Sequence, residues 1–177
     1  LIDFYLNSPF TSTAFYPFAL IDNAYTSKLI FSSISIVLFL ISIHLLAKKF
    51  VLGHEEILCL LPILFYIPIR NHILFGQSYM LVFFLVVVGF YVIDKNKWIV
   101  GSTFLSLAAL IKIFPIFYFL PLLLTNKRKV AFYIFFSTLG FVSISIYTSG
   151  FSFWYTYLFD VLPNSIINES TVDYHFS

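Results

Sequence analysis

The sequence has 177 residues, of which 60% are hydrophobic and only 10% are charged, and its formal net charge is +2. The mean hydropathy of +0.97 excludes an ordinary soluble domain, and so small a net charge argues against a nucleic-acid partner. The single cysteine, Cys59, lies inside an apolar run, so neither a disulfide framework nor a thiolate metal site is expected. The composition predicts an integral membrane protein.

Residues 1–28 show no long apolar helix pattern. The segment is mixed, aromatic and turn-rich, and it contains Pro9 and Pro17. We therefore expect a loop that lies at the outer membrane surface. Because the chain starts with Leu1 and lacks a basic, signal-like region, we also expect an incomplete fragment of a longer protein.

Five apolar segments follow, and they predict membrane helices. A bilayer core about 30 Å thick needs roughly 20 residues at about 1.5 Å rise each. The segments cover residues 29–47, 51–69, 78–93, 98–124 and 130–147. They predict an all-α, polytopic transmembrane helical bundle whose core covers residues 29–147. Residues 148–177 are polar and aromatic, and we expect them to form an outer loop that is truncated.

Clusters of basic residues give the expected orientation, because short cytoplasmic loops carry an excess of Lys and Arg. The clusters stand at residues 48–49, 94–97 and 126–129. If all of them lie inside, segment 98–124 must enter the membrane and return. Pro115 is the expected turning point, because proline removes a backbone donor and disfavours helix in the residue before it. Lys112 would then lie part-way down a cavity open to the outside.

A polar cluster interrupts the apolar pattern ahead of the third predicted helix. Its members are Arg70, Asn71, His72, Gly76 and Gln77. Arg70 follows an expected helix C-terminus, where the helix dipole favours a cation. Gly76 and Gln77 precede an expected helix N-terminus, whose free N–H groups attract an anion such as phosphate. On this topology the cluster shares the outer face with Lys112, and we predict a phosphate-binding site there.

Lys112 is the strongest single candidate within that site. A charged side chain in a membrane segment costs roughly 2.5 to 3.5 kcal/mol on insertion scales, so a lysine retained in mid-segment is a functional candidate. The alternative for Lys112 and Arg70 is a structural role in which the long side chain reaches the lipid headgroups. The residue pattern leaves both interpretations open.

Three motifs follow one another along the chain. They are "NHILFGQSYMLV" at 71–82, "LAALIKIFPIFYFLPLLLTNKRK" at 107–129 and "FWYTYLFDVLP" at 153–163. Their order resembles glycosyltransferase family 87, whose bacterial members are similar to polyprenyl-phosphate-mannose-dependent mannosyltransferases. "FYPFAL" at 15–20 is similar to the Tyr-Pro-Pro element of that family, with Phe18 in place of the second proline. Tyr79 stands where the family usually has an asparagine.

The resemblance implies an α-helical membrane enzyme of the glycosyltransferase C superfamily. Such an enzyme would move a hexose, mannose-like, from a polyprenyl-phosphate donor to a glycolipid or glycan acceptor at the outer face of the bacterial cytoplasmic membrane. Lys112 and Arg70 would hold the phosphate, and Tyr16, Asn71 and Gln77 would orient the sugar hydroxyls or the phosphate. His72 and Gly76 belong to the same binding cluster. The implied catalytic acid belongs to an outer loop expected upstream of Leu1, so no catalytic residue is assigned.

The residues themselves favour a lipid-linked donor. A nucleotide sugar would call for a soluble domain, a Gly-rich phosphate loop or a paired-aspartate motif, and the sequence has none of these. Besides the donor and the acceptor, the expected partners are membrane lipids. No cofactor and no metal site is predicted, with a divalent ion left open. The alternatives are a non-enzymatic transporter or lipid-carrier flippase, whose path would also be lined by broken helices and buried charge, and a packing fragment whose active part lies elsewhere.

Overall fold

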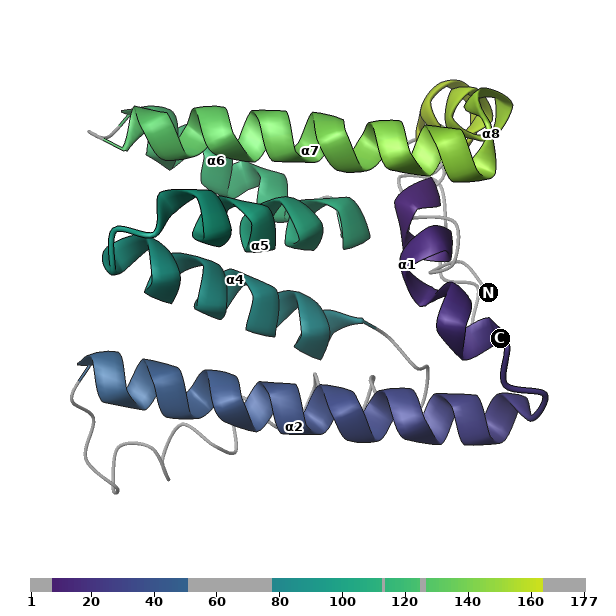
Figure 1. Ribbon diagram of the computed structural model, residues 1–177, viewed down its shortest axis with the longest axis horizontal. Coiled ribbons are helices and arrows are strands. Elements are labelled where there is room, and N and C mark those ends of the chain that lie inside the picture. Colours follow the sequence, from purple (N-terminus) through teal and green to yellow (C-terminus); the bar gives the residue numbers. More distant parts are fainter. Residues whose placement is uncertain (1–7, 51–77, 113, 125–126, 164–177) are drawn as a thin grey trace, which may run out of the picture.

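A computed structural model describes residues 8–50, 78–112, 114–124 and 127–163 (Figure 1). Every element in these ranges is helical, which confirms the all-α prediction. The elements are α1 (Pro9–Ala19), α2 (Ala24–Phe50), α4 (Tyr79–Asp94), α5 (Trp98–Ile111), the 3₁₀ helix η2 (Phe114–Tyr118), α6 (Phe119–Leu124), α7 (Arg128–Ser149), α8 (Phe151–Thr156) and the π-helical turn η3 (Tyr157–Val161). The predicted helix at 51–69 lies outside the described residues.

Two of these helices, α2 and α7, are long and apolar enough to cross a membrane. Only 22% of the most apolar stretch of α2, and 17% of that of α7, is buried inside the protein. A core helix of a soluble protein would be mostly covered, whereas here large side chains such as Val37 and Phe136 face outward at 56% and 64% exposure. Lipid tails suit such a surface, because its side chains are apolar and a helix satisfies its backbone hydrogen bonds internally.

Four helices lie side by side in the order α2, α4, α5, α7, and each packs on the next (Figure 1). The tight turn between α4 and α5 includes Asn96, whose φ of +60° is a left-handed conformation that asparagine tolerates. This turn, the end of α2 and the start of α7 lie at one end of the bundle, which we call the basic end. The start of α4, the end of α5 and helices α1 and α8 lie at the opposite end, the α1 end.

Small residues let α4 and α5 approach closely. A Cβ atom placed on Gly101 would lie 2.6 Å from the carbonyl oxygen of Gly89 and 2.5 Å from Cγ1 of Ile93. On the other side of α5, the hydroxyl of Ser106 donates to the carbonyl of Ile134 in α7 at 3.0 Å. Close backbone approach and interhelical hydrogen bonds are the main attractive forces between helices in lipid, where burial of apolar area contributes little.

The chain reverses within residues 98–124, as predicted, but the break is at Lys112 and not at Pro115. Helix α5 ends at Ile111, and Lys112 has the extended backbone angles φ −137° and ψ 136°. The chain then runs back through η2 and α6, and α6 packs against α7. Pro115 lies in the first turn of η2, where its missing N–H costs no helical hydrogen bond.

The loop predicted for residues 1–28 is wrong as secondary structure over most of its described part, residues 8–28. Helix α1 begins at Pro9, a position that suits the fixed φ of proline, and its first turn is buried. Helix α2 begins at Ala24, five residues before the predicted start at Leu29, because the side chain of Asn23 caps it. The Asn23 amide oxygen accepts hydrogen bonds from two backbone N–H groups of the first turn, at 2.9 and 3.3 Å. The outer location of residues 1–28 stays a prediction.

The described part of the predicted loop 148–177 is also helical. Gly150, with φ of +90°, ends α7 and lets α8 turn away from it. The ring of Trp154 is buried, and its Nε1 donates to the hydroxyl of Ser145 at 3.1 Å. Aromatic packing against α7 therefore holds a helix that is too short to show a sequence period.

Candidate functional site

Lys112 lies where α5 breaks, at the α1 end of the bundle. Its backbone N–H still donates to the carbonyl of Ala108 at 3.0 Å, so the residue closes the last turn of the helix. The residue is only 7% exposed, which is rare for a lysine. The C-terminal end of a helix is the favourable end for a cation, because the carbonyl groups there carry partial negative charge.

The ring of Tyr79 lies next to this lysine. The Nζ atom of Lys112 is 4.9 Å from the centre of the Tyr79 ring, within the range of a cation–π interaction. Tyr79 is the first residue of α4. The contact therefore joins the end of one apolar helix to the beginning of another. Tyr79 is also the position at which the sequence differs from the pattern described above, where an asparagine is usual.

The start of α1, together with its N-cap residue Ser8, covers the end of α5 with hydroxyl groups. The last carbonyls of a helix have no partner within the helix and need other donors. The hydroxyl of Ser8 donates to the carbonyl of Leu110, and that of Thr11 donates to the carbonyl of Ile111 at 3.5 Å. Both side chains are buried. Sequence reasoning missed these residues, because their partners are about a hundred positions away along the chain.

The predicted site residues fall into two groups. Lys112 and Tyr16 are both at the α1 end, but Lys112 is buried whereas Tyr16, on α1, is 61% exposed. The structure therefore places Tyr16 on the surface and not in the buried surroundings of the lysine. Outside the described residues lie Arg70, Asn71, His72, Gly76 and Gln77. Their place in the phosphate site stays a prediction.

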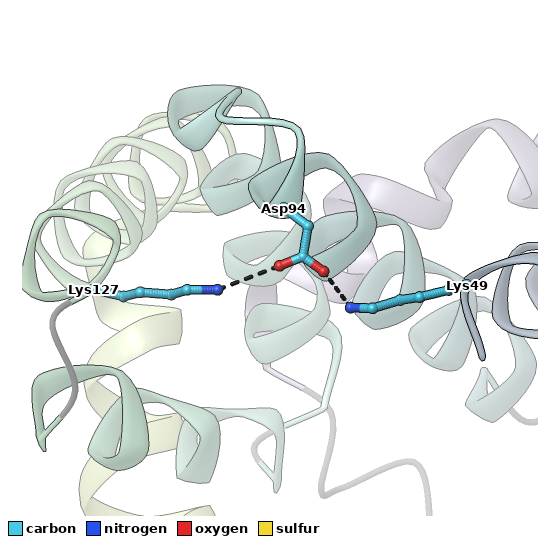
Figure 2. Close-up of polar contacts among 3 residues, drawn as sticks. All are labelled: Lys49, Asp94 and Lys127. Atoms are coloured by element: carbon cyan, nitrogen blue, oxygen red, sulfur yellow. Dashed lines mark hydrogen bonds and ion pairs between the residues drawn. The ribbon is translucent and has the colours of Figure 1, made fainter.

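The basic end gathers charges from three separate segments (Figure 2). Asp94, at the end of α4 and beyond its apolar stretch, forms ion pairs with Lys49 of α2 and, at 3.3 Å, with Lys127 before α7. The Lys49 ammonium beside Asp94 holds the pKa of that carboxyl below its ordinary value; burial opposes this shift, and Lys127 adds to it. The three basic clusters of the sequence thus lie at one end of the bundle, as the orientation argument requires, and Lys112 lies at the other.

Comparison with known sequences adds a family assignment to this geometry. The sequence model of glycosyltransferase family 87 matches residues 5–174, which is nearly the whole chain. No curated protein and no solved structure gave a significant match. The matched range includes the three motifs of the sequence, the break at Lys112 and both ends of the bundle.

Proposed function

Starting from the fact that this chain belongs to glycosyltransferase family 87 and is a membrane glycosyltransferase, we propose that it transfers a hexose from a polyprenyl-phosphate donor. The sugar is mannose-like, and the acceptor is a glycolipid or a glycan. The reaction takes place at the outer face of a bacterial cytoplasmic membrane that the chain crosses several times. Membership of the family favours this enzyme over the transporter and flippase considered from sequence alone.

One observation carries the proposal, namely the buried Lys112 at the break of α5. A lysine held at low exposure among apolar helices is costly, and an anionic ligand is the kind of partner that makes its charge useful. The phosphate of a lipid-linked sugar supplies that charge at membrane depth. A nucleotide sugar would have to come from water, and the sequence has no phosphate loop or paired-aspartate motif to hold one.

The chemistry assigns a definite role to a cation at this position. In the transfer, the bond between the sugar C1 and the donor phosphate oxygen breaks, and a bond forms between C1 and the acceptor hydroxyl oxygen. The acceptor proton goes to a general base, and the polyprenyl phosphate leaves with the electron pair of the broken bond. Negative charge grows on the leaving phosphate, so a fixed ammonium group such as Lys112 lowers the barrier by stabilising it.

The orientation follows from the separation of the two ends. Short cytoplasmic loops carry the excess of Lys and Arg, so the basic end belongs inside and the α1 end outside. Lys112 and Tyr16 both lie at the α1 end, which supports an active site facing outward. The predicted phosphate contacts of Arg70, Asn71 and Gln77 belong to this same proposal, together with those of His72 and Gly76.

Lys112→Met tests the proposal, because methionine keeps the length and apolar stem of the lysine and removes only the charge. The matched control is Lys97→Met, which changes the lysine at the other end of α5. Both proteins are measured in membranes for transfer of radiolabelled hexose from a polyprenyl-phosphate donor, with insertion checked by membrane fractionation. We expect Lys112→Met to lose at least 100-fold in rate, about 2.7 kcal/mol, and Lys97→Met to stay near wild type. A Lys112→Met enzyme with normal turnover would contradict the role of this residue.

A further inference from the structure

A polar pocket lies at the basic end, at the opposite end of the bundle from Lys112. Its cavity has a volume of about 730 Å³, which is within the range of about 300–1,000 Å³ that small-molecule sites occupy. The turn between α4 and α5 forms one side of it, and the start of α7 forms the other. The polar and aromatic residues that line it are Asp94, Asn96, Trp98, Lys127, Arg128 and Lys129. We call it the basic pocket.

The charges of the basic pocket do not cancel. Asp94 is its single acidic lining residue among those described, and this carboxylate is already paired with Lys127 and with Lys49 from outside the pocket (Figure 2). Arg128 and Lys129 are the other two cations of the lining. Within the described part of the chain Arg128 has no acidic partner, and the Nζ atom of Lys129 lies 5.7 Å from the centre of the Trp98 ring. The pocket therefore carries a net positive charge and suits an anion.

The position of the pocket limits what that anion can be. It lies where α4 ends and where α5 and α7 begin. In a bundle that crosses the membrane, we expect lipid headgroups at this level. Trp98 is 36% exposed at its edge, as expected of a tryptophan at the boundary between lipid tails and water. Arg128 offers a planar guanidinium that binds two oxygens of a phosphate at once. These features together match a phosphate attached to acyl chains.

We propose that the basic pocket binds the phosphate group of an anionic phospholipid in the leaflet at that end of the bundle. Arg128 and Lys129 hold the phosphate oxygens, Asn96 offers a further hydrogen-bonding group, and Trp98 packs against the glycerol region. The lipid bridges the turn between α4 and α5 to the start of α7 and so stabilises the bundle. This site is independent of the transferase site at the α1 end.

The test compares lipids and variants on the purified full chain after delipidation in detergent. Melting temperature is followed after addition of dioleoyl-phosphatidylglycerol, dioleoyl-phosphatidylcholine, glycerol 3-phosphate or inorganic phosphate. The pocket variant is Arg128→Gln with Lys129→Gln. The control is Lys95→Gln with Lys97→Gln, which removes the same charge at the same end from residues that do not line the pocket.

We expect phosphatidylglycerol to raise the melting temperature of the wild type and the control by several degrees. The pocket variant should keep less than half of that shift, and phosphatidylcholine should give none. Equal shifts in the pocket variant and the control would overturn the proposal, as would an equal effect of phosphatidylcholine. A full shift from glycerol 3-phosphate or inorganic phosphate would overturn the assignment to a lipid and show a site for a soluble anion.

A second measurement needs no variant. Amide hydrogen exchange of the wild type is followed in peptides covering residues 94–98 and 127–130, with each lipid in turn. Slower exchange in both peptides with phosphatidylglycerol alone supports the site, because a bound lipid would close both sides of the pocket. Unchanged exchange in both peptides would contradict it.

Discussion

The Nζ atom of Lys112 lies 4.9 Å from the centre of the Tyr79 ring, and this contact ties the end of α5 to the start of α4. A cation over an aromatic face is worth about 0.5–1 kcal/mol where it is exposed and about 2 kcal/mol where water is excluded. With Lys112 only 7% exposed, the contact is nearer to the second case. The aromatic ring therefore helps the protein to keep a charged lysine in a buried position.

A double-mutant cycle on these two residues measures the contact directly. The variants are Tyr79→Leu, Lys112→Met and their combination, and the free energy of unfolding in detergent is compared. We expect a coupling energy of about 1–2 kcal/mol, because the second change costs little once the first has removed the contact. Tyr79→Phe is the control, since it keeps the ring and should retain most of the coupling. Strictly additive effects in the cycle would show that the two side chains do not stabilise one another.

The larger helices and the reversal were accessible from sequence because they depend on local chemistry. The apolar run before Asp94 predicted α4, and α4 ends at Asp94 in the structure. Pro115 led to the expectation of a turn within segment 98–124, because proline restricts its neighbours whatever the fold, but the helix ends earlier, at Ile111, and Pro115 lies within η2. Helices α1 and α8 were missed because they are short and are held by packing on distant helices, as the buried Phe10 and Trp154 show.

The candidate site was predictable only in part, and for the same reason. Lys112 could be identified because the cost of a charge in an apolar segment depends on the segment alone. Its neighbours could not, since Tyr79 and Ser8 are brought to the end of α5 by tertiary packing. Asn23 carried a usable signal, because asparagine ahead of an apolar run is a preferred N-cap, and attention to it would have placed the start of α2 correctly.

Gly101 is the most sensitive position in the packing of α4 on α5. Gly101→Ala places a methyl group 2.6 Å from the backbone oxygen of Gly89, which cannot move without shifting the helix. We expect a loss of about 1–3 kcal/mol in unfolding free energy, typical of an overpacked contact. The measurement is thermal or denaturant unfolding of the purified protein in detergent.

Gly140→Ala is the control for this change. Gly140 also lies inside a helix, α7, and a Cβ atom there would meet nothing within 4 Å. Because alanine favours helix over glycine, we expect this variant to be neutral or more stable by up to about 1 kcal/mol. Equal losses of unfolding free energy in the two variants would show that the close approach of α4 and α5 is not the cause of the loss at Gly101.

The ion pairs of Asp94 predict a stability that depends on pH. The pKa of Asp94 is lowered in the folded protein, first by Lys49 and then by Lys127, so the folded state binds its proton less readily than the unfolded state. The contribution of the carboxylate is therefore complete at pH values above the ordinary pKa of about 3.9 and is lost as the pH falls through the lower folded value. Because the side chains are 37% to 50% exposed, we expect only about 0.2–1 kcal/mol from each pair.

Asp94→Asn removes this contribution while keeping the shape of the side chain. At pH 7 and low salt the variant should unfold at a lower temperature than the wild type. The difference should shrink as the pH is lowered below about 4, where the wild-type carboxyl also becomes neutral, and it should shrink in 1 M salt, where the Debye length is about 3 Å. Asp22→Asn is the control. Asp22 is exposed in the turn between α1 and α2, near the α1 end, and it forms no ion pair with the residues that the structure describes. A difference for Asp94→Asn that persists unchanged at low pH would assign its cause to packing and not to charge.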